Sequence, residues 1–68
     1  MVKVGDKLIM KSEVALENNI TGSDREFTIT ELRGYLQREH GFEVILENKS
    51  GEVLQCDFNL KYFDYVKA

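Results

Sequence analysis

The sequence contains no proline, no tryptophan, a single cysteine and a single histidine. One cysteine cannot form an internal disulfide, and one cysteine with one histidine cannot supply the four ligands of a structural zinc site. Long apolar runs are also missing: no stretch approaches the roughly 20 residues of a membrane-spanning helix. The opening residues lack the apolar segment of a signal peptide. We therefore expect a cytoplasmic protein that does not enter a membrane.

An excess of basic residues is absent as well. Twelve acidic residues stand against nine basic ones, which gives a net charge of −3. General nucleic-acid binding depends on lysine and arginine side chains that neutralise phosphates, so this balance disfavours it. The 68 residues, 43% of them hydrophobic, suit one small globular domain over 1–68. A domain of this size buries only about 60% of its unfolded surface, so its stability is marginal.

The clearest structural pattern is a β-hairpin over residues 42–58. Two alternating apolar runs flank the sequence Asn48-Lys49-Ser50-Gly51, which predicts a strand, a tight turn and a second strand. The Asn48 side chain can bond the backbone two residues on, and Gly51 can adopt the left-handed conformation that closes a three-residue loop. This turn places Glu47 opposite Val53.

The register assigns each hairpin residue to one of two faces, because side chains alternate along a strand. The inward face carries six residues that we expect in the core: Phe42, Val44, Leu46, Leu54, Cys56 and Phe58. The outward face carries several acids, with Glu43 opposite Asp57. These acids form either a solvated surface or an acidic patch that meets a basic partner.

The first part of the chain predicts a strand and a long loop. A turn at Val4-Gly5-Asp6 leads into a strand from Leu8 to Leu16. Residues 17–26 are polar and form a loop of about ten residues, a length that often signals function.

Residues 27–40 support two interpretations. The alternating, β-branched run that begins at Phe27 favours a strand to about Arg33, followed by an irregular segment from Tyr35 to His40. The alternative is a helix over 29–40, because a capping box begins at Thr28 and apolar residues recur at helical spacing. Gly34 argues against that helix by about 1 kcal/mol. After the hairpin, residues 59–63 predict a helical turn, and 64–67 a last short strand.

This order of elements resembles the SH3-like small β-barrel family across nearly the whole chain. The matching parts are Val4-Gly5-Asp6 before the first strand, the loop 17–26, the strand from Phe27, the hairpin 42–58 and the turn 59–63. The resemblance implies an all-β, five-stranded SH3-like barrel with a 3₁₀ turn before the last strand. The alternative is an α+β fold with the helix over 29–40 packed on a small antiparallel sheet.

The chain departs from signalling SH3 domains, because it lacks their ALYDY-like run, their tryptophan and their proline. Recognition of proline-rich peptides is therefore not expected. The opening is also similar to KOW-type barrels, whose RNA role the acidic balance opposes. Small acidic barrels of this kind are familiar among phage and prophage proteins that bind a host protein.

No catalytic constellation is visible. Cys56 faces the core by the register argument, so it is expected to be a structural thiol rather than a nucleophile. His40 lies in a polar stretch and is expected to be a solvated loop residue. We expect no cofactor site, no metal site and no enzymatic activity.

Three functional hypotheses follow. The first is a protein-interaction module, in its concrete form a phage or prophage regulator of a host protein. The SH3-like resemblance implies a groove between the loops and the turn, which would bring Tyr62 and Tyr35 together. Its candidate partner-binding residues are Tyr35, Tyr62, Asn19, Asp24, Arg25, Glu43 and Asp57.

The second hypothesis is a nucleic-acid-binding barrel, less favoured on charge. It would use exposed aromatic side chains and six basic residues: Lys3, Lys7, Lys11, Arg25, Arg33 and Arg38. The third is a small oligomer-forming structural subunit, joined through open strand edges. The sequence leaves open whether the protein is a monomer or a small homo-oligomer.

Overall fold

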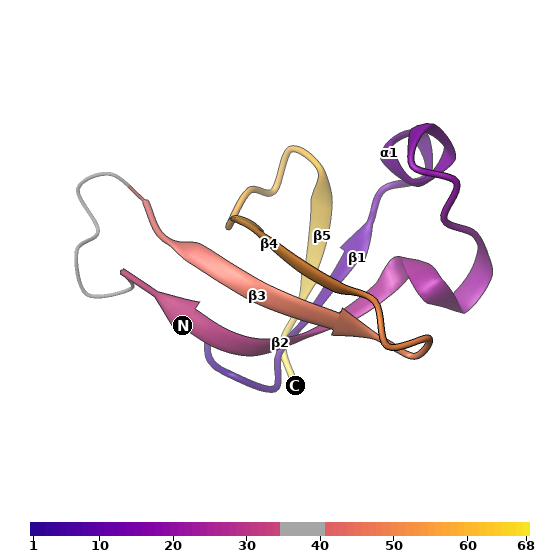
Figure 1. Ribbon diagram of the computed structural model, residues 1–68. Helices are drawn as coiled ribbons and strands as arrows, with labels where there is room; N and C mark the ends of the chain where they lie inside the picture. The colour runs from indigo at the N-terminus through magenta and orange to yellow at the C-terminus, as the bar shows by residue number, and fades with distance from the viewer. Residues whose placement is uncertain (35–40) are drawn as a thin grey trace.

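A computed structural model describes residues 1–34 and 41–68. These residues form one antiparallel sheet of five strands in the order β4-β3-β2-β1-β5 (Figure 1). The predicted all-β fold with five strands is confirmed. The sheet curves, but no hydrogen bonds between described residues join β4 to β5, so the expected barrel is not closed in this way. β4 and β5 are therefore the two edges of the sheet.

The strand predicted from Leu8 to Leu16 is wrong beyond its first residues. Strand β1 covers Lys7–Met10, and helix α1 covers Ser12–Glu17. Val14 and Leu16 alternate as in a strand, but only Ala15 of the helix is fully buried, whereas Leu16 is 78% exposed. Glutamate, alanine and leucine are good helix formers, and the burial of Ala15 against the core selects the helix.

The predicted loop 17–26 contains a short 3₁₀ helix, η1, over Gly22–Arg25. Strand β2 then covers Glu26–Arg33, so the strand interpretation of this region is confirmed. The alternative helix over 29–40 is wrong for residues 29–33, because β2 pairs with both β1 and β3 and buries Phe27 and Ile29 between them. Residues 35–40, including the predicted irregular segment, lie outside the described residues.

The hairpin has the predicted register. Strand β3 covers Glu43–Asn48 and strand β4 covers Val53–Asp57. Glu47 lies opposite Val53, Val44 opposite Cys56, and Glu43 opposite Asp57.

The hairpin turn has the predicted chemistry. Oδ1 of Asn48 accepts the backbone N–H of Ser50 at 3.1 Å and that of Glu52 at 2.9 Å. Gly51 has φ +82°, a backbone angle that residues with a side chain rarely adopt. Nδ2 of Asn48 donates to the Asp24 carbonyl at 3.1 Å, so the turn is also tied to η1.

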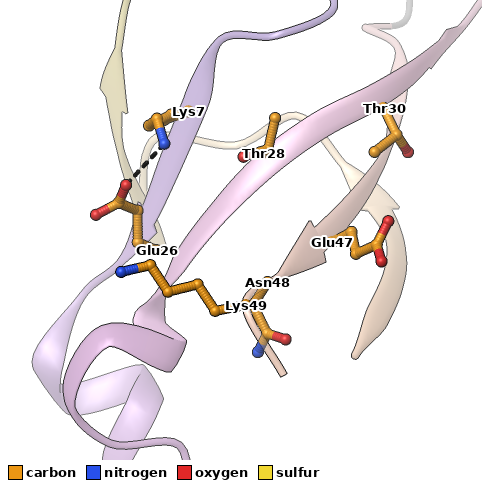
Figure 2. A pocket seen from close by; sticks show the side chains of 7 residues that line it. All are labelled: Lys7, Glu26, Thr28, Thr30, Glu47, Asn48 and Lys49. Carbon is orange, nitrogen blue, oxygen red and sulfur yellow. Dashed lines mark hydrogen bonds and ion pairs between the residues drawn. The ribbon is translucent and has the colours of Figure 1, made fainter. Parts of the chain in front are cut away.

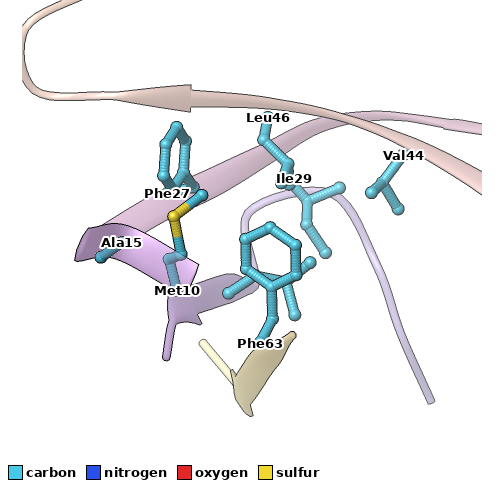
Figure 3. Close-up of a cluster of buried hydrophobic side chains, with 8 residues drawn as sticks. Met10, Ala15, Phe27, Ile29, Val44, Leu46 and Phe63 are labelled. Atoms are coloured by element: carbon cyan, nitrogen blue, oxygen red, sulfur yellow. The ribbon is translucent and has the colours of Figure 1, made fainter. Parts of the chain in front are cut away.

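The core lies on the inward face of the sheet (Figure 3). Phe27 and Phe63 make an edge-to-face contact with ring centroids 6.4 Å apart, as aromatic pairs prefer. The fully buried apolar residues come from β1, α1, β2, β3 and β5: Leu8, Met10, Ala15, Phe27, Ile29, Val44, Leu46 and Phe63.

All six inward hairpin residues pack in or against the core, as predicted, but not all of them are fully buried. Val44 and Leu46 on β3 are fully buried. The inward residues of β4 are only half-buried, because β4 has a neighbouring strand on one side. Phe42 and Phe58 are also half-buried and stack with centroids 4.9 Å apart.

The last strand, β5, covers Phe63–Val66 and pairs with β1. The turn expected before it is present: the Tyr62 N–H donates to the Asn59 carbonyl at 3.4 Å, in the manner of a 3₁₀ turn. Asn59 Oδ1 accepts the Lys61 N–H at 2.8 Å and fixes this turn.

The carboxylate of Asp6 joins the two ends of the chain. It is fully buried, and it accepts the Tyr65 hydroxyl at 2.6 Å, the Ala68 N–H at 2.9 Å and the Lys3 N–H at 3.0 Å. These hydrogen bonds, chiefly the one from Tyr65, lower the pKa of Asp6 from 3.8 to about 2. Strand β5 is thereby held to the turn that precedes β1.

Candidate interaction surfaces

The first surface, which we name the end hollow, lies where β1, α1, η1 and the turn before β5 meet. Its volume is about 430 Å³, and its lining residues are Lys11, Ser12, Glu13, Val14, Arg25, Lys61 and Asp64. Three of these side chains are cationic and two are acidic. The end hollow is therefore a polar depression with a small excess of positive charge.

Hydrogen bonds to the backbone tie together the segments that carry the cations of the end hollow. Arg25 Nε donates to the Met10 carbonyl at 2.9 Å, so η1 is tied to the end of β1. The Lys11 N–H donates to the Tyr62 carbonyl at 3.0 Å, which ties the same segment to the turn before β5. Lys11 Nζ also lies 3.9 Å from Asp64 Oδ1, an exposed pair of little energetic weight.

Exposed apolar side chains flank Lys61 in the chain. Leu60 is 51% exposed and Tyr62 is 45% exposed. The Lys61 ammonium lies 5.9 Å from the centre of the Tyr62 ring, within the range of a cation–π contact. The end hollow thus has an exposed tyrosine close to its cations, and tyrosine and arginine are enriched at the energetic centres of protein interfaces.

A second depression, the outer groove, crosses β1, β2 and β3 on the outward face of the sheet (Figure 2). Lys7 Nζ and Glu26 Oε1 form an ion pair of 2.8 Å at one side, and this pair lowers the pKa of Glu26. The volume is about 290 Å³, and the lining residues are Lys7, Glu26, Thr28, Thr30, Glu47, Asn48 and Lys49. Lys7 and Glu26 neutralise each other, and Glu47 and Lys49 line the groove with opposite charges, so the groove has no net charge.

The candidate residues of the long loop have different environments. Arg25 lines the end hollow. Asp24 instead fixes η1 to the hairpin turn, because its Oδ1 accepts the Ser50 hydroxyl at 2.8 Å and its carbonyl accepts Asn48 Nδ2. Asn19 is exposed just after α1 with φ +58°. Of these three, only Arg25 joins the end hollow.

The remaining candidates are spread over the molecule. Tyr62 is exposed, and it follows Lys61 of the end hollow in the chain. Tyr35 lies outside the described residues, and so does the predicted contact between the two tyrosines. Glu43 and Asp57 face each other at the end of the hairpin distant from its turn, and neither of them lines the end hollow. The acids and the end hollow are two separate surfaces.

Sequence reasoning missed the grouping of Lys11 and Lys61 with Arg25. Lys11 was recognised as a basic residue. Its position beside Arg25 and Lys61 depends on the end of the strand at Met10, which the sequence did not reveal. The signal for Lys61 was its position in the predicted turn between Leu60 and Tyr62.

Cys56 is half-buried on the inward face of β4. Burial, followed by the charges of Asp57 and Glu43, raises the pKa of its thiol. A raised pKa leaves little thiolate at neutral pH, so the environment opposes nucleophilic behaviour. Within residues 1–34 and 41–68, no group of three or more histidine, cysteine or acidic side chains could hold a metal ion. His40 lies outside this part.

Among the described residues, the helices are too short and too polar to cross a membrane. No family model, no curated protein and no solved structure matches the chain.

Proposed function

We propose that the protein is a non-enzymatic protein-interaction module that binds its partner through the end hollow. The observation that supports this most is the grouping of Lys11, Arg25 and Lys61 around one depression, with exposed Leu60 and Tyr62 flanking Lys61 in the chain. Such a surface complements a partner segment that combines a carboxylate with an apolar side chain. The apolar contact supplies affinity and the charges supply orientation.

In its concrete form, the protein is a small cytoplasmic regulator, encoded by a phage or prophage, that binds a host protein. The support for this setting is an analogy of size, acidic charge and sequence pattern with the SH3-like barrels named above. The acids of the hairpin would add long-range steering toward basic regions of the same partner.

The test is quantitative capture of partners from a bacterial lysate on the immobilised protein, repeated with matched variants. Tyr62→Ala and Lys61→Glu each alter an exposed residue of this surface, so the fold should tolerate them. We expect each to weaken a saturable partner about tenfold or more, in line with the loss of an interface hot spot.

Lys67→Glu is the matched control for Lys61→Glu, because it makes the same charge change at another exposed lysine. It should leave binding within about twofold. The proposal fails if no saturable partner is captured, or if Tyr62→Ala and Lys61→Glu bind as well as the control.

A nucleic-acid-binding role is the second candidate, and the same cluster of Lys11, Arg25 and Lys61 favours it. Two other cations assigned to that role are engaged elsewhere, since Lys7 pairs with Glu26 and Arg33 Nε lies 2.7 Å from Glu31 Oε2. Fluorescence anisotropy with single-stranded DNA and RNA decides between the two roles. Binding that falls steeply with salt and is lost in Lys61→Glu would establish this role, and no binding at low salt would end it.

A further inference from the structure

Strand β4 has an open edge in the described part of the chain, because its only neighbour in the sheet is β3. The hydrogen bonds at both ends of the hairpin, from Asn48 N–H to the Glu52 carbonyl and from Phe58 N–H to the Phe42 carbonyl, fix the pairing pattern. Hydrogen-bonded and non-hydrogen-bonded pairs alternate in an antiparallel ladder.

Counting from either end, Leu54 and Cys56 direct their backbone groups toward β3. Val53, Gln55 and Asp57 direct theirs toward the open edge. The edge therefore offers the N–H and C=O groups of these three residues to an added strand.

The inward face beside this edge is incompletely covered. Leu54, Cys56 and Phe58 are half-buried, whereas Val44 and Leu46 on the neighbouring strand are fully buried. A strand added to β4 would place every second side chain over this face. Apolar residues at those positions would complete its burial.

The outward side chains beside the edge are acidic. Asp57 lies opposite Glu43, and Glu47 lies opposite Val53, which is 61% exposed. In the described part of the chain, neither Glu47 nor Asp57 belongs to an ion pair. Arg33 faces Glu43 across β2 and β3, but its Nε bonds to Glu31.

A second copy of this chain does not complement that charge. Its two edge strands are β4 and β5, and the outward residues of these strands are Val53, Gln55, Asp57, Asp64 and Val66. None of them is a cation, so pairing between copies would leave the carboxylates unmatched. Acids at a strand edge also discourage pairing with like-charged strands.

We propose that the open edge of β4 binds an extended segment of a partner protein in which basic and apolar residues alternate. The segment adds a strand to the sheet, its lysine or arginine side chains reach the acids of β3 and β4, and its apolar side chains cover Leu54 and Cys56. The inference rests on the proposed interaction function, but it concerns a surface separate from the end hollow.

The experiment titrates the protein with a short peptide of alternating lysine and valine, followed by NMR amide shifts or anisotropy. Two control peptides separate the contributions: one replaces lysine with glutamate, and one keeps lysine but carries N-methyl groups on alternate amides, which blocks strand pairing. We expect shifts along β4, affinity that falls with salt, and at least about tenfold weaker binding of both controls.

Variants test the same interaction from the side of the protein. Gln55→Pro removes an N–H that faces the open edge, a position where edge strands tolerate proline. Asp57→Lys reverses the charge, and Glu17→Lys makes the same charge change on exposed α1 as its control. We expect about 2- to 10-fold weaker binding for Gln55→Pro and a larger loss for Asp57→Lys, with Glu17→Lys and Tyr62→Ala unchanged.

Thermal unfolding checks that each variant is folded, and Asp57→Lys keeps the test valid if Gln55→Pro does not fold. The proposal is overturned if the lysine–valine peptide does not bind, if the N-methylated peptide binds equally well, or if Asp57→Lys has no effect. It is also overturned if sedimentation shows that the protein self-associates and that Gln55→Pro abolishes this. Loss of captured partners in Tyr62→Ala with normal peptide binding would separate this result from that of the end hollow.

Discussion

Strands β3 and β4 share one alternating pattern and one turn, yet their inward side chains have different environments. Val44 and Leu46 on β3 are fully buried, while their partners Cys56 and Leu54 on β4 are half-buried. The residues are similar in kind, so composition does not explain the difference. A strand with two neighbours is covered on both sides, and an edge strand is not.

The two edges of the sheet also differ from each other. Strand β5 is fixed by the bond between Tyr65 and the buried carboxylate of Asp6, whereas β4 is hydrogen-bonded within the sheet to β3 alone among the described residues, and Phe58 just after it packs edge-to-face on Tyr65. The partner strand proposed above is placed on β4, the edge that the Asp6 carboxylate does not hold.

The largest expected effect is a difference in unfolding free energy between a substitution on the central strand β3 and one on the edge strand β4. Leu46→Ala should cost about 2–5 kcal/mol of unfolding free energy, because it removes a fully buried side chain and leaves a cavity. Leu54→Ala should cost roughly 1–2 kcal/mol, because only part of that side chain has left water. Denaturant unfolding at low temperature measures both, and equal costs would contradict the comparison.

A smaller effect should appear at the β5 edge as the pH falls. Because the pKa of Asp6 is about 2 in the folded chain and 3.8 without its partners, its stabilising contribution is complete above about pH 5. It is lost as the pH falls toward 2. Asp6→Asn should therefore lower the melting temperature at pH 5 and approach the wild type at pH 2.

Tyr65→Phe provides the matched test, because it removes only the hydroxyl that donates to Asp6. It should reproduce part of the loss at pH 5. A difference between Asp6→Asn and the wild type that stays constant from pH 5 to pH 2 would show that this carboxylate does not anchor β5.

The smallest effect concerns thiol reactivity. Burial raises the pKa of Cys56, so it should react with a thiol reagent at pH 8 more slowly than an unfolded cysteine. In a Val44→Cys, Cys56→Ser double variant, the cysteine on β3 should react more slowly still. Similar reaction rates at both positions would mean that the reagent reaches the edge strand no more easily than the central strand.

The hairpin was predictable because its determinants are local. Asn48 and Gly51 define the turn, and alternation along the chain defines the two faces, so register and direction followed without tertiary information. Helix α1 was not predictable in this way, since Val14 and Leu16 fit a strand and the burial of Ala15 in the core favours the helix. The candidate site was the least predictable part, because Lys11, Arg25 and Lys61 come from three separate segments of the chain.

By itself, the sequence favoured the all-β class and determined the register of the hairpin, the inward place of Cys56 and the acids opposite each other at Glu43 and Asp57. Each of these depends on neighbouring residues or on the period of a strand. Only the tertiary structure decided which inward residues are fully buried, which edge is anchored through Asp6, and which cations share a depression. Those properties depend on contacts between segments far apart in the chain, and the periodicity of a sequence carries no record of such contacts.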